Sequence, residues 1–136
     1  MKDIYGLDSN VLLRYIVDET DNPEQTEKAT HFLEKNCSEE TPGYINIIVL
    51  VEIVWVLRTA YKYPREKIVA LLHRILYNRD LKIEQYKSVL AALEQYETGS
   101  ADFADYLIGQ LNKDQGCQTT VTFDTQAGEG GNFELL

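Results

Sequence analysis

Short apolar segments that alternate with amphipathic segments are the feature that most constrains the fold of this chain. Extended segments are expected at residues 3–8, 44–47, 81–84, 119–123 and 133–136. Between them, apolar residues spaced three and four apart predict helices. Strands separated by helices are typical of a parallel sheet with both faces covered. The pattern predicts an α/β fold, namely a three-layer α/β/α sandwich with a central, mostly parallel sheet.

Cap and turn residues set the expected boundaries of these elements. Asn22 precedes Pro23, which suits the first position of a helix. Ser100 is expected to cap a helix that starts at Ala101 and ends near Asp114. No repeat, low-complexity tract or long linker divides the chain. Residues 1–136 are therefore expected to form a single domain.

The apolar runs and the cysteines indicate the cellular compartment of the protein. The start of the chain lacks the apolar stretch of a secretory signal, and the longest apolar run, Ile47–Val51, is much shorter than the roughly 20 residues that cross a bilayer. Cys37 and Cys117 lack metal-ligand spacing and are expected to be reduced thiols. The sequence predicts a cytoplasmic protein that does not contact a membrane.

The charges are unevenly distributed. The net charge is −9, which argues against binding of nucleic acid by the protein surface as a whole. The stretch 56–90, however, carries eight cations and only three anions. This asymmetry indicates either an acidic site with a separate basic contact surface, or simply solvated helix faces.

Two of the expected strands lead to an aspartate, Asp8 and Asp124. In an open parallel sheet, ligands bind beyond the carboxyl ends of the strands, so both side chains are expected at one crevice. The alternative for each residue is that it caps the helix that follows, because Asp is a favoured N-cap.

Glu52 is the only charged residue between Tyr44 and Leu57. A carboxylate in such an apolar stretch costs several kcal/mol unless it is paired, protonated or bound to a metal. The alternative is a partly exposed position near the start of the helix. The position makes Glu52 a candidate site residue.

Asp102 and Asp105 lie three residues apart in the first turn of an expected helix, so both project from one face. Acidic residues are also common there because the helix N-terminus stabilises them. Several carboxylates in one crevice would repel each other unless a divalent cation neutralised them. Oxygen ligands suit Mg²⁺ or Mn²⁺ rather than Zn²⁺, and His31 and His73 stand alone.

Four segments in chain order carry a family resemblance. GLDSNVLLRYI, IVLVEIVWVL, ADFADYLIGQL and VTFDTQA resemble the successive motifs of the PIN domain, specifically those of VapC-type toxins, from Ile4 to about Ala127. By position, the four family acids match the residues Asp8, Glu52, Asp105 and Asp124. Asp102 resembles an additional acidic residue that one branch of the family carries. Ser9 and Asn10 match a polar pair in which Thr is more usual than Ser.

The resemblance implies a metal-dependent endoribonuclease that hydrolyses RNA phosphodiester bonds. It implies Asp8 and Asp105 as central Mg²⁺ or Mn²⁺ ligands, with Asp124 and Glu52 completing the shell or orienting the nucleophilic water. Ser9, Asn10 and Asp102 would orient substrate and ligands. A cognate antitoxin and a homodimer are the partners that the resemblance implies.

Two other functions stay open from the sequence. A phosphatase of the haloacid-dehalogenase type also begins with an Asp at a strand end, but usually has a second Asp where this chain has Asn10. A non-catalytic PIN-like module that only pairs with a partner protein is the other alternative. A metal-titrated assay on single-stranded RNA separates these possibilities.

Overall fold

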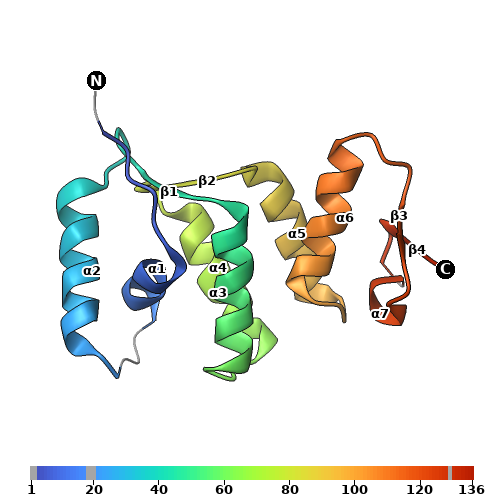
Figure 1. Ribbon diagram of the computed structural model, residues 1–136, viewed down its shortest axis with the longest axis horizontal. Helices are drawn as coiled ribbons and strands as arrows, with labels where there is room; N and C mark the ends of the chain where they lie inside the picture. The colour runs from blue at the N-terminus through green and yellow to red at the C-terminus, as the bar shows by residue number, and fades with distance from the viewer. Residues whose placement is uncertain (1–2, 18–20, 129) are drawn as a thin grey trace. The chain divides into compact units, whose positions relative to one another are not determined.

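The computed structural model describes residues 3–17, 21–128 and 130–136, which form two compact units (Figure 1). The first unit ends at Glu84, and the second runs from Gln85 to Leu136. No helix within the described ranges is long and apolar enough to cross a membrane.

The first unit contains four helices and two named strands among its described residues. Its elements in chain order are α1 (Ser9–Ile16), α2 (Pro23–Asn36), β1 (Gly43–Ile45), α3 (Ile47–Thr59), α4 (Arg65–Tyr77) and β2 (Leu81–Ile83). α1 lies beside both α2 and α3 (Figure 1). The α2 start agrees with the sequence, since the side chain of Asn22 accepts a hydrogen bond from the Gln25 N–H and Pro23 is the first helical residue.

Three extended segments of this unit run in parallel. β1 pairs with β2, with Ile45 opposite Ile83. Residues 5–7 join the other side of β1 through a bridge between Gly6 and Tyr44. In this register, the residues that follow the three segments lie in one row at the carboxyl edge.

The core of the first unit comes mainly from the inner faces of its helices. α3 is apolar over most of its length, and Leu50, Ile53 and Leu57 on its inner side are fully buried. Leu12 of α1 and Ile68 of α4 are also buried. These side chains recur at spacings of three and four, as expected for helices that cover a sheet.

The described residues of the second unit form two long helices, one short helix and a small parallel sheet. Its elements are α5 (Tyr86–Thr98), α6 (Phe103–Asp114), β3 (Thr120–Thr122), α7 (Thr125–Gly128) and β4 (Phe133–Leu135). α5 packs along α6, and Phe103 is fully buried at the start of α6. β3 and β4 pair in parallel, with Thr122 opposite Leu135. The expected strand near the C-terminus is confirmed.

Parallel pairing and helical cover confirm an α/β protein. The pairings among the described residues form one two-stranded sheet in each unit, so a single central sheet stays a prediction. The expected start of α6 was wrong. The helix begins at Phe103 with Asp102 as its N-cap, two residues after Ser100.

Candidate functional site

Asp8 stands at the carboxyl end of the first extended segment and caps α1. One of its carboxylate oxygens, Oδ1, accepts a hydrogen bond of 2.7 Å from the Ser9 N–H. Asp8 is exposed, Ser9 is half-buried, and Asn10 is exposed on the first turn. The capping alternative is therefore observed for Asp8, and it leaves the carboxylate open to solvent.

Two polar residues that the sequence analysis did not select extend the row that Asp8 begins. Asn46 follows β1 and caps α3, because its side-chain oxygen accepts a 3.0 Å hydrogen bond from the Val49 N–H. Glu84 follows β2, and its Oε1 accepts a 2.9 Å hydrogen bond from the Ile47 N–H. The carboxyl edge of the three parallel segments thus carries two carboxylates and an amide, as expected of a ligand-binding edge.

Glu52 lies on the outer face of α3. Ile48 and Trp55, one turn before and after it, are 70% and 58% exposed, and Glu52 is exposed as well. The expected cost of burying this carboxylate was wrong, because the apolar stretch around it covers both faces of the helix. The carboxylate of Glu52 remains accessible to a ligand, and the side chains of Ile48 and Trp55 beside it expose apolar surface to solvent.

Asp102 and Asp105 form a capping box at the start of α6. The Asp102 side chain accepts from the backbone N–H of Asp105, and Asp105 Oδ2 accepts from the Asp102 N–H at 3.3 Å. Just before the box, the Ala101 N–H donates to the Tyr106 hydroxyl at 3.2 Å. Asp105 is half-buried and Asp102 is exposed. Both carboxylates are fixed at the positive end of the helix.

Asp124 follows β3 and caps the short helix α7. Its Oδ1 accepts hydrogen bonds from the backbone N–H groups of Gln126, at 2.9 Å, and Ala127, at 3.3 Å. The Asp124 N–H donates to the hydroxyl of Thr122 at 3.0 Å. The capping alternative is observed here too, and the side chain is exposed.

The structure places these acids in two sets. Asp8 and Glu52 belong to the first unit, and the acids Asp102, Asp105 and Asp124 belong to the second. Within the described ranges, no group of three or more His, Cys, Asp or Glu is arranged to hold a metal ion. His31 is exposed and His73 stacks on Tyr77, so neither residue acts as a centre for such a group.

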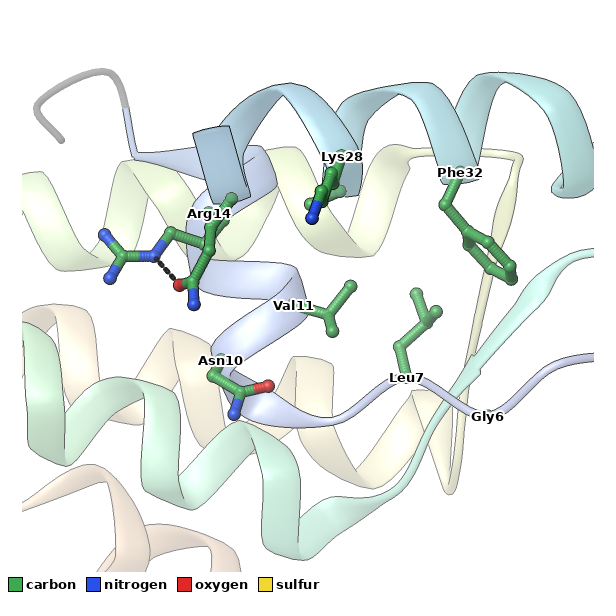
Figure 2. A pocket seen from close by; sticks show the side chains of 9 residues that line it. Gly6, Leu7, Asn10, Val11, Arg14, Lys28 and Phe32 are labelled. Atoms are coloured by element: carbon green, nitrogen blue, oxygen red, sulfur yellow. Dashed lines mark hydrogen bonds between the residues drawn. The ribbon is translucent and has the colours of Figure 1, made fainter. Parts of the chain in front are cut away.

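A pocket of about 420 Å³ opens between α1 and α2 in the first unit. Figure 2 shows Asn10 and Arg14 on one side and Lys28 and Phe32 on the other. The Arg14 Nε donates to the Gln25 side-chain oxygen at 3.2 Å, drawn as the dashed line. Asn10, which lines this pocket, also belongs to the polar pair that follows Asp8.

A comparison with known protein families matches the stretch of the chain that contains the expected site residues. The model of the PIN domain family matches residues 5–129. The chain belongs to the PIN domain family. All seven expected site residues of this PIN domain lie inside the matched region.

A curated relative supports the same assignment. This PIN domain is 26% identical over 117 residues to a VapC ribonuclease of Aquifex aeolicus (strain VF5), and the match covers 86% of this chain and 84% of the relative. No solved structure matches the chain significantly. The assignment to the PIN domain family therefore rests on sequence similarity alone.

Proposed function

We propose that this PIN domain is a toxin-type endoribonuclease that hydrolyses RNA phosphodiester bonds with Mg²⁺ or Mn²⁺. The family match over residues 5–129, the stretch that contains every candidate acid, carries the proposal. The similarity to a protein named VapC ribonuclease supports the toxin class. The family match also favours nuclease over phosphatase chemistry.

Asp8, Glu52, Asp105 and Asp124 are proposed as the metal-binding and catalytic residues. Their donor chemistry fits a hard divalent cation, since carboxylate oxygens are the ligands that Mg²⁺ and Mn²⁺ prefer. The hydrogen bonds described for Asp8 and Asp124 use Oδ1, and both side chains are exposed. When bound, the cation neutralises these carboxylates and supplies positive charge against the charge that develops on the scissile phosphate.

The chain's own residues contribute orientation. The helix caps hold Asp8, Asp105 and Asp124 in fixed rotamers before any ligand arrives, which lowers the entropic cost of binding. Glu52 is proposed to complete the ligand shell or to orient the nucleophilic water. Ser9, Asn10 and Asp102 are proposed to orient substrate and ligands from positions next to these acids.

The assembly proposed for this function follows the same family. Because the family model spans both units, we propose one domain over residues 1–136 with a three-layer α/β/α sandwich around one mostly parallel sheet. A homodimer, inhibition by a cognate antitoxin and a cytoplasmic location are further parts of the proposal. The free thiols of Cys37 and Cys117 agree with a reducing compartment.

A metal-titrated cleavage assay on single-stranded RNA tests the function. Wild-type protein is expected to cut RNA with Mg²⁺ or Mn²⁺ and to stop when EDTA is added. Asp8→Asn, which keeps an acceptor for the Ser9 N–H, is expected to stay folded and to lose cleavage. Folded wild-type protein that binds an antitoxin but never cuts RNA would instead identify a non-catalytic module.

A further inference from the structure

The turn between α3 and α4 brings aromatic rings and cations together. The rings of Tyr61 and Tyr63 lie 5.5 Å apart at an angle of 44°. Lys67 Nζ stands 3.8 Å from the centre of the Tyr63 ring, a cation–π distance. Lys62, between the two tyrosines, is exposed. We call these four residues the tyrosine turn.

The backbone holds the tyrosine turn in one conformation. The N–H groups of Tyr61 and Tyr63 donate to carbonyl oxygens in the last turns of α3, at 3.2 and 3.0 Å. Lys62 has φ 57, in the left-handed region that favours glycine. Two hydrogen bonds that flank a left-handed residue hold the backbone of both tyrosines, while the contact between the two rings and the Lys67 contact with Tyr63 orient the side chains.

The charge around the tyrosine turn is opposite to that of the protein. Residues 58–67 contain four cations and a single anion, although the net charge of the chain is −9. The cations are Arg58, Lys62, Arg65 and Lys67, and the anion is Glu66. A basic patch with aromatic rings between its cations is the pattern that binds single-stranded nucleic acid.

A second hollow of the first unit, of about 590 Å³, begins at Tyr61 and has Asn10 on its wall. This volume lies within the range of small-ligand pockets and accommodates a nucleobase. Arg14 also lines it, and its Nη1 lies 3.0 Å from Asp21 Oδ1, a pairing that lowers the pKa of Asp21. Because Asn10 is two residues after Asp8, the hollow connects the start of α1 with the tyrosine turn.

We infer that the tyrosine turn binds unpaired nucleotides of the RNA substrate. A base stacks against Tyr61, and the cations of the turn contact the phosphates on either side. The faces of bases in a duplex are covered by their neighbours, so the site selects loops and single-stranded segments. This inference rests on the proposed function and specifies which residues hold the substrate.

Binding without metal tests the inference separately from catalysis. The anisotropy of a fluorescein-labelled, unstructured oligouridine is measured with protein in EDTA, and a hairpin-free RNA duplex is the comparison ligand. Tyr61→Leu keeps an apolar side chain but removes the ring, and is expected to weaken oligouridine binding about 5- to 150-fold, the usual range for one stacked base. Tyr61→Phe, the matched control, keeps the ring and is expected to bind like the wild type.

Lys62→Gly tests the phosphate contact. Glycine accepts the left-handed backbone without strain, so the turn is expected to keep its shape. Loss of one phosphate contact is expected to reduce the slope of log affinity against log salt by about 0.7 for a single strand. Circular dichroism and melting curves confirm that each variant is folded.

The outcomes distinguish this inference from the proposed function. Equal oligouridine affinity for wild type, Tyr61→Leu and Lys62→Gly, with metal-dependent cleavage intact, overturns the inference and leaves the nuclease assignment standing. Binding of the duplex as tightly as oligouridine also overturns the inference. If Tyr61→Leu loses binding while Tyr61→Phe keeps it, the inference holds even if the wild type cuts no RNA.

Discussion

A comparison of variants at Asp105 and Asp102 distinguishes the structural role of a carboxylate from its role in metal binding. Both belong to the capping box of α6, where Asp105 Oδ2 accepts the Asp102 N–H at 3.3 Å. An Asn side chain keeps an oxygen acceptor but loses the charge. The variants Asp105→Asn and Asp102→Asn therefore remove one negative charge each from the same helix end, while both keep the capping hydrogen bonds.

The effect of each variant on the metal-free protein is expected to be small. A carboxylate in the first turn of a helix contributes about 0.3–1 kcal/mol through the helix dipole. For a chain of this size, 1 kcal/mol moves the melting temperature by roughly 4 °C, so loss of this contribution lowers the melting temperature by roughly 1–4 °C, and in Asp105→Asn the relief of repulsion among the proposed ligands acts in the opposite direction. Asp105→Ala also removes the acceptor for the Asp102 N–H and is expected to lose a further 0.5–1.5 kcal/mol, approximately.

Metal produces the difference between the variants. A ligand at 100 times its dissociation constant stabilises the folded protein by about 2.7 kcal/mol, or roughly 11 °C by the same conversion. Wild type and Asp102→Asn are expected to show this rise with Mn²⁺. Asp105→Asn is expected to show little of it at the same concentration, since a proposed central ligand has lost its charge.

Differential scanning calorimetry with a Mn²⁺ titration measures both effects, and RNA cleavage is assayed on the same samples. An undiminished Mn²⁺ shift and undiminished cleavage in Asp105→Asn would refute its role as a ligand. A shift lost in Asp102→Asn but kept in Asp105→Asn would exchange the roles of the two residues. A shift absent from all proteins, wild type included, would contradict the metal site.

Three further outcomes follow from the structure. Glu84→Ala is expected to lower stability by about 0.5–1.5 kcal/mol because the Ile47 N–H loses its acceptor, whereas Glu84→Gln keeps it; chemical denaturation compares the two variants. Because burial raises the pKa of the Cys37 thiol, a thiol reagent is expected to label exposed Cys117 first. For the same reason, the contribution of Cys37 to the free energy of unfolding is complete below the pKa of an unfolded thiol, about 8.5. This contribution falls as the pH rises through the folded pKa of Cys37. Gly109→Ala is expected to destabilise the second unit by about 1–3 kcal/mol, since an added Cβ would lie 2.7 Å from an aromatic ring of β4; melting curves test this, and an unchanged melting temperature would show that β4 does not pack on α6 as described.

The sequence predicted the elements well where local chemistry decides them. Asn22 and Pro23 begin α2 as expected, and β3 lies in the segment expected to lead to Asp124. The expected strand before Asp8 is reduced to a single parallel bridge between Gly6 and Tyr44. The start of α6 could not be predicted in this way, since Ser100 and Asp102 are both good N-caps. The structure favours Asp102, whose box partner lies three residues on at Asp105.

The site was harder to predict because exposure and register depend on tertiary structure. Glu52 looked costly in its apolar stretch, but Ile48 and Trp55 beside it are themselves exposed. A helix that is apolar on all sides gives no sign of which face is covered. Glu84 was expected to be the last residue of a strand, and only the parallel register of β1 and β2 places it just beyond β2 and beside Asn46.

The caps at Asp8, Asp105 and Asp124 have a consequence for how an active gene would lose its toxicity. One nucleotide change turns an aspartate codon into an asparagine codon, and asparagine maintains these helix starts. In cells selected for survival without the proposed antitoxin, Asp-to-Asn alleles at these three positions should therefore accumulate as full-length, folded and harmless protein.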